Sequence, residues 1–166
     1  NDSNKMMAGE LLEVKDDFLK VVSLDGHRIS IRNIQLKEHY DNHKVIVPGK
    51  TLSEISKILT GDNEKEVLIY FSKNHILFEF DDTVVVSRLI DGEYFKIDHM
   101  LSSDYETRVK LNKRDFMDNI DRAMILIRDS DRKPIIMNVE DNNVNMKVKS
   151  AFGSMNANVP AHKSGK

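Results

Sequence analysis

Apolar and polar residues alternate along three stretches of the chain, and a short polar segment interrupts each alternation once. The stretches are residues 11–24 (LLEVKDDFLKVVSL), 67–80 (VLIYFSKNHILFEF) and 135–149 (IIMNVEDNNVNMKVK). A period of two around a polar break is typical of a β-hairpin, so each stretch predicts two antiparallel strands. The three stretches also align with one another, which indicates an internal repeat. Equivalent positions are Val14, Phe71 and Val139, then Asp16, Lys73 and Asp141, then Leu19, Ile76 and Val144.

The segments between these stretches change to a helical period. Residues 44–61 run from a short β-branched strand into a predicted helix, for which Gly61 supplies a stop. Residues 108–127 repeat this order of strand and helix. The apolar faces that the spacing predicts are Leu52, Ile55, Ile58 and Leu59 in the first helix, and Phe116, Ile120, Ala123, Met124 and Ile127 in the second.

The repeating unit is therefore a strand, a helix, a hairpin and a further strand. The further strand is predicted at residues 83–90 after the second hairpin and at 153–159 after the third. Two complete copies follow one copy that lacks the opening strand and helix. A repeated helix beside antiparallel strands predicts an α+β fold in which each helix covers one face of a sheet. We expect pairs of such units to form one domain.

Composition and charge narrow the classes of protein. The 166 residues are 40% apolar and 31% charged, and no apolar run is long enough to cross a bilayer. The first residues contain neither an initiator methionine nor a signal peptide, so we interpret the chain as part of a longer protein. The absence of cysteine excludes disulfides and Cys-ligated zinc. The balance of 25 basic and 27 acidic residues argues against capture of nucleic acid by the surface as a whole.

A dense cluster of polar chemistry is Asp25-Gly26-His27-Arg28, which interrupts a run of strand-forming residues. Glycine tolerates positive φ and aspartate can bond its own backbone, so a tight turn with an exposed histidine and arginine is one interpretation. An acid–base hydrolase that uses Asp25, His27 and His99 is a second interpretation. A purely structural repeat module is a third.

Other arrangements of reactive side chains are sparse. His39 and His43 are four residues apart, but they fall in an expected loop, where this spacing does not suit a metal. Asp81 and Asp82 are expected in a turn. The sequence contains no Gly-rich phosphate loop and no nucleophile elbow. We therefore expect no catalytic residue, no metal and no cofactor.

Four segments occur in an order that is typical of one protein family. They are SLDGHRIS (residues 23–30), VIVPGKTL (45–52), SRLIDGEYFKIDHML (87–101) and NKRDFMDNIDRAMIL (112–126). Together they resemble the middle and third domains of the bacterial sliding clamp, the beta subunit of the replicative DNA polymerase. The resemblance implies a DNA-clamp fold and three segments: 1–98 as the middle domain without its first strand and helix, 99–104 as the interdomain connector, and 105–166 as the first half of the third domain.

The resemblance also implies a processivity factor without catalytic activity. Clamps of this family contain three copies of an internally duplicated domain, and two chains close into a ring around duplex DNA without reading its sequence. A pocket at the junction of the middle and third domains receives a short peptide motif of the polymerase, the clamp loader and repair proteins. By position, the implied pocket residues are Met7, Leu24, Gly26, His27, Arg28, Ile29, Phe95, His99 and Met100.

In this family the helices line the channel that holds the DNA. The implied DNA-facing residues are Lys50, Lys57 and Arg122. Lys50 and Lys57 are seven residues apart, so they lie nearly in line along one helix. The parent protein is expected to be a homodimeric ring in the bacterial cytoplasm, associated with the nucleoid and with no membrane. The 166 residues alone are not expected to close a ring, because they lack the first domain.

Overall fold

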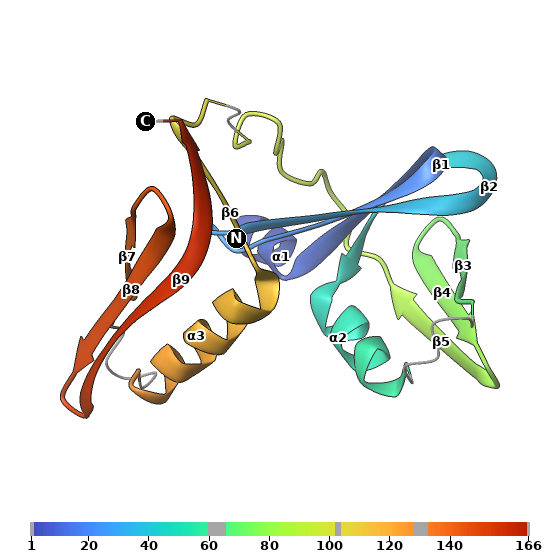
Figure 1. The fold of residues 1–166 in the computed structure, drawn as a ribbon. Helices are drawn as coiled ribbons and strands as arrows, with labels where there is room; N and C mark the ends of the chain where they lie inside the picture. Colours follow the sequence, from blue (N-terminus) through green and yellow to red (C-terminus); the bar gives the residue numbers. More distant parts are fainter. Residues whose placement is uncertain (1, 60–65, 102–103, 128–132, 166) are drawn as a thin grey trace. The chain divides into compact units, whose positions relative to one another are not determined.

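The computed structural model describes residues 2–59, 66–101, 104–127 and 133–165. The chain divides into two compact units, Asn1–Asp98 and His99–Lys166 (Figure 1). Both units combine helices with antiparallel strands, which confirms the predicted α+β class. No helix in the described ranges is both long enough and apolar enough to cross a membrane.

The first unit contains a two-stranded antiparallel ribbon, β1-β2, and a three-stranded antiparallel sheet of order β3-β4-β5. The β3–β4 pair confirms the hairpin predicted for residues 67–80. The elements, in chain order, are α1 (Asp2–Met7), β1 (Gly9–Leu24), β2 (Ile29–Pro48), α2 (Gly49–Ile58), β3 (Leu68–Phe71), β4 (His75–Phe80) and β5 (Thr83–Arg88).

The hairpin predicted for residues 11–24 is wrong, because both halves of this stretch belong to the single strand β1. β1 pairs with β2 on both sides of the polar segment, and the pairing passes from Val14↔His43 to Phe18↔Gln35. A short segment of β1 therefore lies opposite a longer segment of β2. A Lys-Asp-Asp sequence can either reverse the chain or form an irregularity within a strand, and here the long partner strand decides the outcome.

The irregularity in β1 also resets the alternation of its side chains. Before it, Val14 belongs to one apolar core and Leu11 to another. After it, Leu19 joins the core of Val14, and Val22 joins the core of Leu11. A regular strand would place Val14 and Leu19 on opposite faces, because an odd number of steps separates them. Asp16 lies between them in a left-handed conformation, with φ 55°, and accommodates the reset.

The first of these cores lies between the ribbon, the β3-β4-β5 sheet and α2. Ile55 is the residue that α2 buries in it. Ile58 and Leu59 were predicted on the same face but are exposed, because the helix ends at Ile58 and Leu59 is already extended. The predicted stop at Gly61 lies outside the described residues. The buried members of this core are Leu12, Val14, Leu19, Val47, Ile55, Ile76, Phe78 and Phe80.

The second unit packs α3 against a four-stranded antiparallel sheet of order β6-β9-β8-β7. The N-cap residue Asn112 starts the helix, since its Oδ1 accepts hydrogen bonds from the backbone N–H groups of Arg114 (2.9 Å) and Asp115 (3.2 Å). The β7–β8 pair confirms the hairpin predicted for residues 135–149. The elements are β6 (Thr107–Leu111), α3 (Lys113–Ile125), β7 (Ile136–Val139), β8 (Asn143–Ser150) and β9 (Gly153–Gly165).

The central residues of the apolar face predicted for α3 pack as expected, whereas two residues at the margin of that face do not. Phe116 and Ile120 pack against the core of the sheet, and Ala123 is buried. Met124 is exposed, because it lies at the edge of the apolar stripe, and Ile127 lies past the end of the helix. The residues that the sheet buries in this core are Val144, Met146 and Val159.

Candidate functional site

The turn between β1 and β2 is held together by its own polar groups. The backbone N–H of Asp25 donates to the carbonyl of Arg28 at 3.1 Å. Oδ1 of Asp25 accepts from the backbone N–H groups of His27 (3.3 Å) and Arg28 (3.0 Å). Oδ2 accepts from Nε of Arg28 at 2.8 Å and also from its Nη2. Gly26 has φ 83°, a conformation that glycine adopts without strain, so the predicted tight turn is confirmed.

These contacts give Asp25 a structural role. The hydrogen bond from the Arg28 side chain, reinforced by the backbone N–H of His27, lowers the pKa of Asp25 from 3.8 to about 2. A general acid must carry a proton at neutral pH, and a carboxyl group with this pKa does not. The geometry therefore does not favour the hydrolase interpretation.

Three of the predicted pocket residues meet at the second apolar core of the first unit, which adjoins the turn. Leu24 is buried in this core, and Ile29 and Phe95 pack against it. The ring of Phe95 meets the ring of Tyr94 edge-on, with 5.6 Å between the centroids. The buried members of the core are Met6, Leu11, Val22, Leu24, Ile46, Tyr94 and Ile97.

A hollow of about 210 Å³ lies against the turn. The residues that line it are Ser23, Leu24, Asp25, Arg28 and Ser30. Leu24 turns its side chain into the apolar core, on the face of the ribbon opposite Ser23 and Ser30. The hollow suits contact with a bound peptide better than reaction with a substrate, because the polar groups of Asp25 and Arg28 already bond to each other.

Tyr94 positions the segment that carries Phe95, although Tyr94 was not among the site residues predicted from the sequence. Its ring is buried, and its hydroxyl lies 3.3 Å from the carbonyl oxygens of both Gly9 and Val22 in β1. Burial, together with the nearby carboxylate of Glu10, raises the pKa of Tyr94, so the hydroxyl keeps its proton and can donate. Tyr94 thereby fastens the segment that carries Phe95 to β1. The one sequence signal for this role was an aromatic pair in an otherwise polar loop.

The remaining predicted pocket residues are not part of this core. Met7 ends α1 and is 43% exposed, whereas its neighbour Met6 is buried in the core. His99 and Met100 belong to the second unit and are exposed. Their place in a shared pocket with the turn stays a prediction.

The predicted DNA-facing residues are exposed on helices but differ in their partners. Lys50 lies in the first turn of α2 and forms no ion pair with any described residue. Lys57 lies in the last turn, and its Nζ donates to Oε1 of Glu54 at 2.7 Å. On α3, Nη2 of Arg122 donates to Oδ1 of Asn119 at 2.7 Å. Within the described ranges, Lys50 is therefore the one of the three without an ion-pair or hydrogen-bond partner on its own helix.

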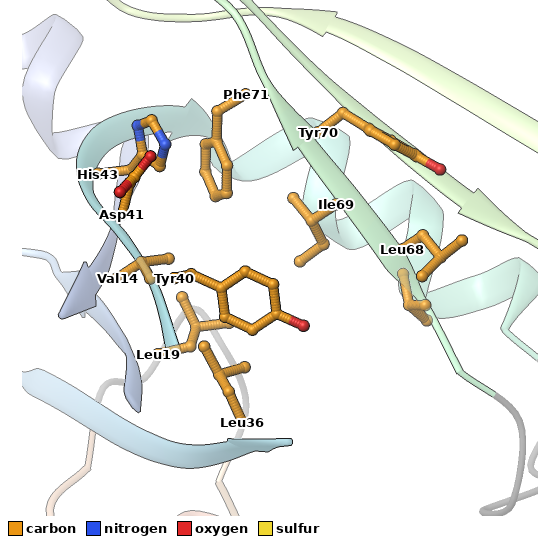
Figure 2. Close-up of a pocket in the computed structure, with 11 residues that line it drawn as sticks. Val14, Leu19, Leu36, Tyr40, Asp41, His43, Leu68, Ile69, Tyr70 and Phe71 are labelled. Atoms are coloured by element: carbon orange, nitrogen blue, oxygen red, sulfur yellow. The ribbon is translucent and has the colours of Figure 1, made fainter. Parts of the chain in front are cut away.

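A cavity of about 490 Å³ opens beside β3 in the first unit. Figure 2 shows Leu19 and Tyr40 of the ribbon on one side of it and Ile69 and Phe71 of β3 on the other. The imidazole of His43 stacks on the ring of Phe71, with 4.9 Å between the centroids and 12° between the planes. None of the site residues predicted from the sequence lines this cavity.

The remaining histidines and paired carboxylates do not form a site in the described parts of the chain. His39 and His43 were expected in a loop but lie in β2. Asp81 and Asp82 form the turn between β4 and β5, as predicted. No group of three or more His, Asp or Glu side chains gathers around a common point among the described residues.

Comparison with known proteins gives one consistent family. Residues 1–96 match the family described as DNA polymerase III beta subunit, central domain. A beta sliding clamp of Staphylococcus epidermidis is 33% identical over 129 residues, which cover 78% of this chain and 34% of that protein. A beta sliding clamp of Staphylococcus aureus is 30% identical over 146 residues, which cover 88% and 38%. The chain thus spans little more than a third of the length of these curated relatives.

Solved structures extend the likeness to the second unit. A DNA polymerase III beta subunit of Eubacterium rectale is 59% identical, with a TM-score of 0.90, and the match covers 100% of this chain and 45% of that one. The DNA polymerase sliding clamp of Bacillus subtilis is 26% identical, with a TM-score of 0.84, over 100% of this chain and 44% of that one. The predicted clamp fold is confirmed.

Proposed function

We propose, because this chain belongs to the DNA polymerase III beta subunit family, that it forms part of a sliding clamp, the processivity factor of a replicative DNA polymerase. The observation that carries the proposal is the family match over residues 1–96, which include the Asp25–Arg28 turn and the apolar core beside it. The relatives named beta sliding clamp support the same role. Because the chain spans little more than a third of their length, the proposed role is that of the longer parent protein.

Within this parent, we assign residues 1–98 to the middle domain, 99–104 to the connector and 105–166 to the first half of the third domain. The division of the chain after Asp98 and the end of the family match at residue 96 support the first boundary. Two parent chains are proposed to close a ring in the cytoplasm of a bacterium, at its nucleoid.

The ring is proposed to hold duplex DNA by encircling it. Lys50, Lys57 and Arg122 are the proposed phosphate contacts, and the near balance of 25 basic and 27 acidic residues fits a loose grip that permits sliding. Lys57 and Arg122 already bond to neighbours on their own helices. We therefore expect Lys50 to contribute most of the three.

The Asp25–Arg28 turn is proposed to be one wall of a docking site for a short apolar peptide motif of the polymerase, the clamp loader and repair proteins. Leu24, Ile29 and Phe95 supply apolar surface, and the fixed turn supplies a polar rim. Met7, His99 and Met100 are proposed to complete the site. Methionine side chains adapt to varied partners, which suits a site that several proteins share.

Retention on circular DNA tests the clamp proposal. The full-length parent, loaded on a nicked circular plasmid, should travel with the plasmid in gel filtration and should leave when the plasmid is cut to a linear form. Lys50→Ala removes one proposed phosphate contact, so it should flatten the salt dependence of loading by about one unit of slope. Lys147→Ala, at an exposed position of β8, is the matched control. Equal retention on circular and linear plasmids would contradict encirclement.

Peptide titration tests the docking site. In the full-length parent, Met100→Asp should weaken binding of a clamp-motif peptide by more than about tenfold, because it places a charge without a partner against the bound apolar side chains. Met100 and Met117 are similarly exposed, at 55% and 50%, so Met117→Asp on α3 is the matched control. Unchanged affinity in Met100→Asp would remove this residue from the site.

A further inference from the structure

One face of the β3-β4-β5 sheet is covered by the first apolar core of the first unit. Ile69 and Phe71 of β3 and Val85 of β5 pack against this core. Ile76 and Phe78 of β4 are buried in it. Because successive side chains of a strand point to opposite faces, the residues between these point away from the core, onto what we call the outer face. The apolar side chains of the outer face are Leu68 and Tyr70 of β3, Leu77 of β4, and Val84 and Val86 of β5.

The apolar side chains of the outer face form one patch. Tyr70 pairs with Leu77, and Leu77 pairs with Val86, so these three residues form a central row across the sheet. The Cβ atoms of such pairs lie about 4.5–5.5 Å apart. Tyr70 is 50% exposed and Val86 is 61% exposed, and Leu68 and Val84 are exposed beside them. A contiguous apolar patch on a protein surface commonly marks a site of contact with another molecule.

The internal repeat indicates that the fold does not require this patch. By the alignment of the hairpins, Tyr70 is equivalent to Asn138 and Leu77 to Asn145. These two asparagines are likewise paired, across β7 and β8. The second unit therefore carries amide side chains at the positions that form the centre of the patch in the first unit. The packing of the sheet itself does not explain why these positions are apolar in the first unit.

Charged side chains flank the central row on both sides. Glu79 lies two residues to one side of this row along β4. Arg88 pairs with His75, two residues to the other side. Each of these steps spans about 7 Å. The hydroxyl of Tyr70 donates to Glu79, and this hydrogen bond is the main cause that raises the pKa of Tyr70. The outer face therefore has an acidic end and a basic end at equal distances from an apolar centre.

A face with this arrangement is complementary to a second copy of itself. Consider two copies stacked face to face about a two-fold axis that runs along the central row. The strands of the two copies are then antiparallel, and Leu77 of one copy meets Leu77 of the other. Glu79 of each copy meets the end that carries Arg88 in the other. Two-fold contacts are the commonest in homo-oligomers and require a self-complementary surface, and stacked sheets lie about 10 Å apart.

We propose that the outer face of the β3-β4-β5 sheet is a contact surface for a second copy of this chain and joins one parent molecule to another. The contact covers the central row of both copies and pairs Glu79 of each with Arg88 of the other. The outer face presents far fewer side chains than the roughly 20–30 residues per partner of a standard interface, so the contact is weak. The inference does not depend on the proposed DNA function.

Sedimentation velocity of the full-length parent, measured at low salt and at rising protein concentration, tests this contact. At the lowest concentration, the sedimentation coefficient reports the assembly of the parent itself, and it should rise above this value as the concentration increases. Val86→Asp places two carboxylates opposite each other, so it should raise the concentration needed for association by more than about tenfold. Met117→Asp, at a 50% exposed position of α3, is the control and should associate like the unsubstituted parent.

An exchange of charges tests the predicted pairing of the two ends. Glu79→Lys places a cation opposite Arg88, and Arg88→Glu places an anion opposite Glu79. Each variant alone should therefore keep its low-concentration sedimentation coefficient at all concentrations. An equimolar mixture of the two variants should associate again, because each then carries the charge that the other needs. Association of the mixture also shows that both variants are folded.

Three outcomes would overturn the proposal. The first is a sedimentation coefficient of the unsubstituted parent that does not change with concentration, as expected if a parent segment or a different protein covers the outer face. The second is association that Val86→Asp leaves unchanged, which would place the contact elsewhere on the molecule. The third is a mixture of Glu79→Lys and Arg88→Glu that associates no more than either variant alone.

Discussion

The two units repeat one pattern but bury different amounts of apolar side chain. Among the described residues, the first unit has two buried cores, one on each side of the ribbon, and the second unit has one core in which the sheet buries three residues. The second unit also exposes Ile136, Met137 and Val139 on its edge strand β7. The first unit holds more of the repeat, from β1 to β5, than the second, from β6 to β9. Since apolar burial supplies most of the free energy of folding, we expect the first unit to be the more stable.

The second unit also buries a polar side chain, and this burial lowers its stability. Asn145 is buried on the face of β8 opposite α3, and its Nδ2 donates to Oδ1 of Asn156 (2.7 Å) and of Asn158 (2.6 Å). Its own Oδ1 is buried and accepts no hydrogen bond from any residue that the structure describes. A buried acceptor in this state costs about 1–3 kcal/mol. We therefore expect the second unit to unfold first.

The largest expected effect on the difference between the two units comes from shortening one buried side chain in each core. Met146→Ala in the second unit and Ile76→Ala in the first should each lower the free energy of unfolding by about 2–5 kcal/mol, because both side chains are fully buried. Met146→Ala should unfold the second unit alone, whereas Ile76→Ala should leave it folded. Denaturation followed by amide exchange in each unit measures the difference. A single transition that both variants shift equally would break the distinction.

A smaller effect is expected at the start of α3. Asn112→Ala removes the acceptor for the N–H groups of Arg114 and Asp115 and should cost the second unit about 0.5–2 kcal/mol. Asn112→Asp retains a capping oxygen and should cost less. The exchange rates of the first-turn amides of α3 report the change. If both variants lose the same stability, the cap is not the cause.

Tyr94 offers the matching test in the first unit. Tyr94→Phe removes the hydroxyl that lies beside the carbonyls of Gly9 and Val22, and it should lower the free energy of unfolding by about 0.5–1.5 kcal/mol. Peptide affinity in the parent should fall as well, because Phe95 loses its support. Tyr105→Phe, at an exposed position of the second unit, is the control. Unchanged stability and affinity would show that ring packing alone holds the segment.

The smallest effect is expected from the pH dependence of the Asp25 turn. The pKa of Asp25 is lowered from 3.8 to about 2, so its contribution to stability is present above pH 3.8 and is lost as the pH falls through about 2. Asp25→Asn should remove this dependence while leaving the second unit unaffected. The carboxyl chemical shift of Asp25, followed by NMR, gives the pKa directly. A midpoint near 3.8 would show that the bonds from Arg28 and His27 do not persist in solution.

The spacing of apolar and polar residues along the sequence predicted most of the local elements of both units. The hairpins at residues 67–80 and 135–149 and the faces centred on Ile55 and Ile120 follow from short-range patterns, and the structure confirms them. The supposed hairpin at residues 11–24 was wrong, because the pairing of β1 with a distant part of β2 decided its shape. Pairing between distant segments does not alter the local alternation of apolar and polar residues, so this alternation could not predict it.

The site was predictable to a similar extent. The turn followed from Asp25 and Gly26, whose backbone chemistry is local. The burial of Met6 in place of Met7, and the anchoring of Tyr94 on β1, depend on which side of a short element meets a distant strand. Neither a helix of one or two turns nor a loop has enough periodic positions to reveal that side in advance.

The irregularity in β1 makes chain length there more critical than residue identity. Residues 15–17 are a polar segment of the kind that ordinarily tolerates insertions and deletions. Here the length of the segment decides which face of β1 each later side chain occupies, because Val14 and Leu19 must reach the same core. Loss or gain of one residue would turn Leu19 outward and its polar neighbours inward, because a shift by one residue moves every later side chain of the strand to the opposite face. A change of two residues would keep the phase, so lengths in this segment should vary by even numbers.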